Sequence, residues 1–208
     1  MVDRIVDAAG RVLVEEGYER ASTKRIAAVA GVSPGSVYQY FPNKEAIVIA
    51  TVEQMVDDLA NGFIATLPRL ADTDPNRTTT AMLATLLDAM QARRELIRVL
   101  VEEVPRLGGS TKATNFEQRI SDLATGYLDA SAAGGARERT TTAVWMVVSC
   151  VSHLTAKYVL EQPPIARDQF VEELTRMVLS YMAMAVPDAQ GGMTRGRGRA
   201  PAAGEVSR

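Results

Sequence analysis

The stretch STKRIAAVAGVSPGSVYQYFPNK, Ser22 to Lys44, decides the fold of this 208-residue chain. Ser22 is a residue type that caps helix N-termini, and the helix expected over residues 23–30 ends at Gly31, which readily adopts the left-handed conformation. Ser33 and Pro34 then read as an N-cap followed by proline at the first helical position. The stretch therefore predicts two short helices joined by a tight turn, a helix-turn-helix.

The second of these helices, expected over residues 33–41, has an unusual outer face. Val37 and Phe41 are spaced i, i+4 and are expected to face inward. The outer positions are then Ser36, Tyr38, Gln39 and Tyr40. An ordinary solvated face would carry Glu and Lys, whereas hydroxyl and amide groups can pair with base edges and phosphates in a major groove. The alternative is an ordinary helical hairpin that never touches DNA.

Two further residues fit a nucleic-acid surface. Gly35 has no side chain, so a sugar-phosphate chain can approach the backbone there. Lys44 opens the next helix, which Asn43 is expected to cap. The Lys44 charge and the free N–H groups at that helix end would then meet at one phosphate.

The segment AGVSPGSVYQYFPNKEA, preceded by STKRIA and by a helix that ends EEGY, resembles the N-terminal DNA-binding domain of the TetR family of bacterial transcriptional regulators. The resemblance implies an all-α homodimer that binds a palindromic operator in double-stranded DNA through residues 33–41. It also implies a C-terminal domain that binds a small-molecule effector and releases the DNA, as in a ligand-responsive repressor. Carried over by position, the family's DNA contacts fall on Lys24, Pro34, Gly35, Ser36, Tyr38, Gln39, Tyr40 and Lys44, with Ser22, Thr23, Arg25 and Ser33 in supporting or phosphate-contacting places.

Composition limits the class of protein. The chain is 47% hydrophobic and 23% charged with a net charge of −2, which is typical of a soluble globular protein. Its single cysteine, Cys150, excludes an intramolecular disulfide and a cysteine-rich metal site. No apolar run reaches the length of a membrane span, and the charged N-terminus is unlike a signal peptide, so we expect a cytoplasmic protein without a membrane partner.

The rest of the chain reads as helices without strand-like alternation. We expect helices over 2–16, 44–67, 78–93, 95–104, 112–133, 136–160 and 165–186, with a loop over 68–76. The domains expected are a DNA-binding domain over 1–48, a regulatory and dimerisation domain over 49–187, and a disordered Gly/Arg-rich tail over 188–208. The helix of 44–67 would bridge the two domains and couple them.

The last two long helices carry apolar stripes wide enough for both a core and a partner. Two such helices from each subunit would form a four-helix bundle about a two-fold axis. The interface residues expected are Val151, Leu154, Tyr158, Leu174, Val178 and Tyr181. The alternative is that these helices serve only the core of one chain.

An effector pocket is expected among the helices of residues 80–160. Nine methionines suit a deformable apolar pocket, although methionine is also ordinary core filler. The lining residues expected are Met55, Leu59, Met90, Phe116, Tyr127 and Trp145.

The sequence indicates no catalytic site. His153 lies three residues after Cys150 on an apolar helix, which is too few ligands for a metal, and we expect a satisfied interior or interface histidine. We therefore expect a protein that is not an enzyme and needs no cofactor or metal. The alternative function is a helical small-molecule-binding or protein-interaction module without operator-specific DNA binding.

Overall fold

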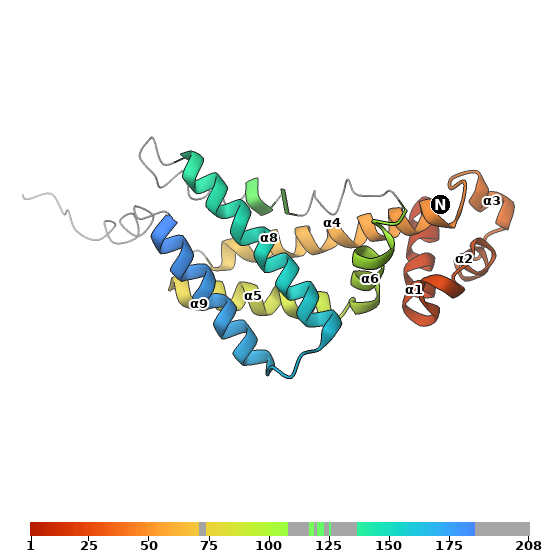
Figure 1. Cartoon of the computed structure of the whole chain (residues 1–208). Helices are drawn as coiled ribbons and strands as arrows, with labels where there is room; N and C mark the ends of the chain where they lie inside the picture. The colour runs from red at the N-terminus through yellow and green to blue at the C-terminus, as the bar shows by residue number, and fades with distance from the viewer. Residues whose placement is uncertain (71–73, 108–116, 119, 123–124, 126–136, 186–208) are drawn as a thin grey trace, which may run out of the picture.

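A computed structural model describes residues 1–70, 74–107, 117–118, 120–122, 125 and 137–185. Within these residues the regular elements are all helical (Figure 1), which confirms the all-α prediction. They are α1 (Val2–Arg20), α2 (Thr23–Ala30), α3 (Pro34–Tyr38), α4 (Lys44–Leu70), α5 (Pro75–Gln91), α6 (Arg94–Arg98), the π-helical turn η1 (Val99–Glu103), α8 (Arg137–Glu161) and α9 (Arg167–Ala185).

Helices α1, α2 and α3 cluster at one end of an elongated molecule (Figure 1). Their shared core is fully buried and includes Ile5, Leu13, Ile26 and Val37. Gly17 breaks the path of α1 with φ 77° and ψ 169°, so the first helix stops where the sequence predicts, and one further turn leads to α2. Burial of these side chains fixes how α2 crosses α1.

Helix α4 runs from this cluster along the rest of the molecule (Figure 1). It packs on α1 at one end and on α5 further along. The approach to α1 is close, because a Cβ atom on Gly10 would lie 3.6 Å from the Thr51 side chain. A longer residue at position 10 would therefore press on α4.

Two predicted boundaries around the first loop are wrong. Helix α4 continues to Leu70, past Pro68, although a proline at this position cannot donate a backbone hydrogen bond to the helix. Helix α5 begins at Pro75, and the Asp74 carboxylate accepts a hydrogen bond from the backbone N–H of Arg77 at 3.2 Å. The loop is therefore shorter than the predicted 68–76.

The helix predicted over 95–104 is found as α6 followed by η1. Most of the helix predicted over 112–133 lies outside the described residues, although 117–118, 120–122 and 125 are helical. The tail predicted over 188–208 also lies outside them.

Helices α8 and α9 form a hairpin beside α5. The Tyr158 ring stacks on Phe170 with centroids 4.1 Å apart, and its hydroxyl donates to the Ile165 carbonyl at 2.8 Å. Arg167 at the start of α9 binds both carboxylate oxygens of Asp88 on α5, at 2.7 and 2.8 Å. By length and composition alone, residues 140–161 of α8 pass as a membrane span, contrary to the sequence prediction, but a core or interface helix passes the same test.

Candidate nucleic-acid interface

The turn between α2 and α3 is closed by backbone and serine hydrogen bonds. Gly31 is left-handed, with φ 66° and ψ 39°, and the N–H groups of Gly31 and Val32 bind the carbonyls of Ala28 and Ala27. The Ser33 hydroxyl accepts the N–H of Ser36 at 3.0 Å and so caps α3. These features confirm the predicted helix-turn-helix.

Helix α3 is shorter than the predicted 33–41. It spans Pro34–Tyr38, Gln39 is its C-cap, and the N–H groups of Tyr40 and Phe41 both bind the Val37 carbonyl. Pro42 explains the early end, because the residue before a proline is sterically disfavoured in the helical conformation. Gln39 and Tyr40 therefore project from a turn at the end of α3.

The predicted inner and outer faces are both present. Val37 and Phe41 are 0% and 8% exposed, whereas Tyr38 and Tyr40 are 56% and 48% exposed, and Gln39 is exposed beside them. The α3 face thus gathers two phenols and an amide around one exposed ridge.

Ser36 is less available than its neighbours. Its side chain is only half-exposed, and its hydroxyl lies 2.8 Å from the Ser33 hydroxyl. Ser22 and Thr23 have structural positions, since the Ser22 hydroxyl caps α2 through the N–H of Arg25 at 3.2 Å and Thr23 is buried. Of these residues only Thr23 lies below the surface, since Ser22 is exposed and Ser36 is half-exposed.

Packing within the chain does not require a glycine at position 35. A Cβ atom built there would have its nearest neighbour, the Ser33 hydroxyl oxygen, at 3.8 Å, which is an ordinary van der Waals contact. The fold would therefore accept a side chain at this exposed position, next to exposed Pro34.

Two of the three predicted cations are bound by the chain itself. The Arg25 Nε lies 2.6 Å from a Glu16 carboxylate oxygen, and this hydrogen bond raises the pKa of the Arg25 guanidinium. The Lys44 ammonium donates to the Tyr18 carbonyl at 3.1 Å and lies 4.0 Å from the centroid of the Tyr18 ring. Lys24 is exposed. Glu16 and Tyr18 were not predicted as parts of this site.

Tyr18 lies where the two parts of the chain meet. Its pKa is raised by burial first, and then by the carboxylates of Glu45, Glu103 and Glu19. Glu103 belongs to η1, outside the helix-turn-helix part, so its charge acts on the side chain that lies against Lys44.

The predicted pocket residues divide into three groups. Met55, Leu59 and Met90 are buried in the core. Trp145 is 57% exposed on α8. Phe116 and Tyr127 lie outside the described residues, as does much of the region in which the pocket was predicted.

The predicted dimer residues also divide. Val151 and Leu174 are buried within a single chain and belong to its core. Tyr158 and Val178 are half-buried against the core, whereas Leu154 is 37% exposed.

The exposed apolar side chains follow a neighbouring stripe on the same two helices. They are Trp145, Met146 and Leu154 on α8 and Met177 and Met184 on α9. The Tyr181 hydroxyl on α9 donates to the Met146 sulfur on α8 at 3.2 Å, so the two stripes adjoin. Met146 and Leu154 are spaced i, i+8, and Met177, Tyr181 and Met184 are spaced i, i+4, i+7. These spacings were visible in the sequence, but adjacent buried residues have similar spacings.

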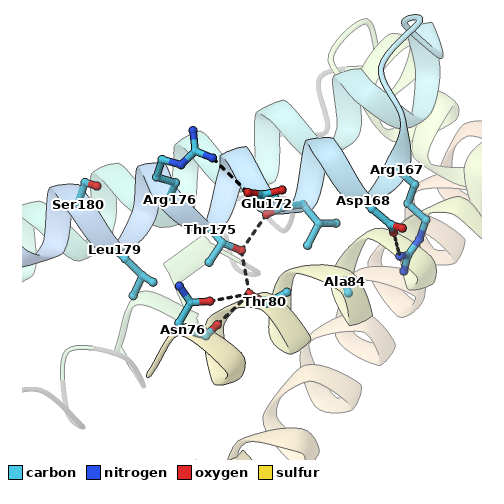
Figure 2. Close-up of a pocket in the computed structure, with 11 residues that line it drawn as sticks. Asn76, Thr80, Ala84, Arg167, Asp168, Glu172, Thr175, Arg176, Leu179 and Ser180 are labelled. Atoms are coloured by element: carbon cyan, nitrogen blue, oxygen red, sulfur yellow. Dashed lines mark hydrogen bonds and ion pairs between the residues drawn. The ribbon is translucent and has the colours of Figure 1, made fainter. Parts of the chain in front are cut away.

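Two grooves open on the described surface. One, of about 680 Å³, lies between α5 and α9 (Figure 2), where the Thr80 and Thr175 hydroxyls face each other between paired charges. The other, of about 360 Å³, lies where α1, α4 and α6 meet and includes Asp7, Arg93 and Leu96. The second groove includes Met55, one of the predicted pocket residues, together with Arg93 and Leu96 from the predicted range of 80–160.

His153 is not an interior residue. Its side chain is 81% exposed, with Nδ1 2.9 Å from the Ser149 carbonyl and 3.7 Å from Glu117. Among the residues that the structure describes, no three His, Cys, Asp or Glu side chains group in a way that would hold a metal ion.

Two family models match the chain. Residues 5–51 match the model described as bacterial regulatory proteins, tetR family, and residues 74–182 match the tetracyclin repressor-like C-terminal domain. The chain belongs to the TetR family. The resemblance of its N-terminal motif is thereby confirmed and extended to the C-terminal helices.

Curated relatives match over part of their length. The fatty acid metabolism regulator protein of Bacillus subtilis is 39% identical over 64 residues, which are 27% of this chain and 33% of the relative. The transcriptional repressor KstR2 of Rhodococcus jostii is 25% identical over 134 residues, 63% of this chain and 65% of the relative. The chain thus spans less than two thirds of these relatives.

Solved structures share the fold over most of the chain. The fatty acid degradation regulator FadR from Bacillus halodurans aligns with a TM-score of 0.63 at 22% identity, over 86% of this chain and 94% of FadR. A tetR-family regulator from Streptomyces coelicolor aligns with a TM-score of 0.69 at 19% identity, over 89% and 82% of the two chains.

Proposed function

We propose that this TetR-family protein is a cytoplasmic, ligand-responsive repressor that binds a palindromic operator as a homodimer. The exposed ridge of Tyr38, Gln39 and Tyr40 at the end of α3 carries the proposal. Gln39 can pair with an adenine edge through two hydrogen bonds, and the tyrosine hydroxyls can reach phosphates. The proposed domain division is 1–48 for DNA and 49–187 for regulation and dimerisation.

The cations of the site would change partners on binding. Arg25 and Lys44 must leave Glu16 and Tyr18 to reach phosphates, whereas Lys24 is exposed at the start of α2. Their charges would then release counterions, so affinity for any duplex should fall as salt rises.

Dimerisation would pair the exposed stripes of α8 and α9 with those of a second copy. Met146, Leu154 and Met184 are apolar side chains exposed in one chain, and a gathering of exposed apolar side chains marks interfaces. A four-helix arrangement would place two α3 helices about 34 Å apart, one turn of the DNA helix.

Release of DNA would follow from a shift between two conformers. A lipophilic small molecule is the effector class proposed, since the predicted pocket residues that are buried, Met55, Leu59 and Met90, are apolar, and the curated relatives include a fatty acid metabolism regulator. Helix α4 and the α6–η1 segment both pack on α1 and would carry the coupling, about 1–3 kcal/mol.

The test is DNA binding over a salt series, with duplexes from the gene's own upstream region and random duplexes. Gln39→Ala should weaken operator binding about tenfold or more and leave random DNA unchanged, since one bidentate base contact is worth about 1–3 kcal/mol. Gln91→Ala, an exposed glutamine at the end of α5, is the matched control. Equal loss on both kinds of DNA would show that Gln39 does not read bases, and salt-independent binding would refute the proposed function.

A further inference from the structure

Arg4, in the first turn of α1, reaches across to the C-terminal end of α2. Its Nη2 donates to the Ala30 carbonyl at 2.7 Å and lies 3.4 Å from the Gly31 carbonyl. The residues are 26 and 27 positions apart in the chain, so this contact belongs to the tertiary structure.

These carbonyls need a donor from outside the helix. The last four carbonyls of an α-helix have no partner within it. At the end of α2 the turn itself supplies two, since the N–H groups of Gly31 and Val32 bind Ala28 and Ala27. Arg4 binds the carbonyl of Ala30, a residue that is only 7% exposed. A guanidinium also suits this place electrostatically, because a helix C-terminus carries a partial negative charge.

The contact is close to α3 along the chain. Only Val32 and Ser33 separate Gly31 from Pro34, the first residue of α3. Within α3 itself Val37 is the buried residue, and Phe41 follows after its end. The near end of α3 is therefore placed mainly by the turn.

We propose that Arg4 is a positioning residue for α3. By holding the carbonyls of Ala30 and Gly31, it fixes the angle at which α3 leaves the turn and presents Gln39. The effect of Arg4 on DNA binding rests on the proposed function. Its effect on the turn is a property of the free protein and can be tested without DNA. It assigns a role to a residue outside the helix-turn-helix.

The test compares Arg4→Ala, Arg4→Lys and the control Arg11→Ala, which removes an exposed arginine from the same helix. Amide hydrogen exchange at Gly31, Val32, Ser36 and Val37 is measured without DNA, because these amides close the turn and begin α3. Dissociation constants for operator and random duplexes are then measured over a salt series, at a temperature where circular dichroism shows every variant folded.

Arg4→Ala should speed exchange at these four amides. It should also weaken operator binding about fivefold with random DNA and the salt slope unchanged, since a charge-assisted hydrogen bond at a partly exposed site is lost. Arg4→Lys should restore part of the loss, because an ammonium can still donate to a carbonyl. Arg11→Ala should leave exchange and the ratio of the two affinities unaltered.

Three results would overturn the proposal. Unchanged exchange would show that the turn does not depend on Arg4. Equal loss on both DNAs, with a salt slope reduced by about one, would make Arg4 a phosphate contact. Faster exchange with an unchanged ratio of affinities would limit Arg4 to stability. If the unaltered protein shows no operator preference, the proposed function fails while the exchange data still decide whether Arg4 holds the turn.

Discussion

Replacing Gly35 with alanine separates the needs of the fold from those of the nucleic-acid interface. A glycine inside a folded chain is usually retained for a positive φ or for lack of space. Neither holds at Gly35, whose φ is not positive and whose added Cβ would lie no closer than 3.8 Å to the Ser33 hydroxyl oxygen. The remaining reason for a bare backbone is contact with another molecule.

The two expected effects have opposite signs. Alanine is preferred over glycine within helices, so Gly35→Ala should leave the free energy of unfolding unchanged or raise it by about 0.5 kcal/mol. Operator affinity should fall about tenfold, because a methyl group between α3 and the sugar-phosphate chain would lengthen several hydrogen bonds at once, each worth about 1 kcal/mol.

The assay pairs urea unfolding with operator binding, and Gly62→Ala serves as the control. Gly62 lies inside α4, and a Cβ atom there would meet nothing within 4 Å. Gly62→Ala should raise stability by about 1 kcal/mol and leave DNA binding unchanged. Full operator affinity in Gly35→Ala would refute the inference that DNA approaches this backbone. A marked loss of stability would refute the conclusion that the fold has room for a side chain at position 35.

Two further perturbations test other parts of the molecule. Leu154→Asp should give a folded monomer in sedimentation velocity, because Leu154 is 37% exposed in one chain. The emission of Trp145, the only tryptophan, should shift to longer wavelength as the second subunit is lost. An intact dimer would place the interface elsewhere. The pKa of Tyr18 is raised in the folded protein, chiefly by burial, so the folded state holds the phenol proton more tightly than the unfolded chain. The stability due to Tyr18 is therefore present below the tyrosine pKa of about 10 and lost above it. Between pH 9 and pH 11 the free energy of unfolding in urea should fall more for the unaltered protein than for Tyr18→Phe. Equal declines would contradict this account.

Local signals in the sequence predicted the helix-turn-helix well because each of them acts over a few residues. Ser22, Gly31 and Ser33 cap or end helices as predicted, and the Asn43 side chain accepts the N–H of Ala46 at 2.8 Å at the start of α4. Asp74 and Pro75 carry the same signal, an N-cap followed by a first helical proline, although the predicted loop over 68–76 includes both.

Properties that depend on tertiary contacts were not predictable in the same way. The partners of Arg25 and Lys44 lie 9 and 26 residues away, so no local pattern identifies Glu16 or Tyr18. Apolar residues recur on two faces of α8. Val151 is buried on one of them and Leu154 is exposed on the other, although both are apolar. Only the position of α5 and α9 decides which of these faces becomes core.

In α3 and the turn after it, the side chains that pack in the core are different from those that face outward. This separation affects how operator preference can change in evolution. Val37 and Phe41 hold this segment to the core, while Tyr38, Gln39 and Tyr40 contribute little to its burial. Under the proposed function, mutations at the three outer positions would alter the DNA sequence that is preferred without a large loss of folded protein. Duplicated copies of such a gene could diverge toward separate operators by single substitutions, and a library randomised at these three positions should remain mostly folded.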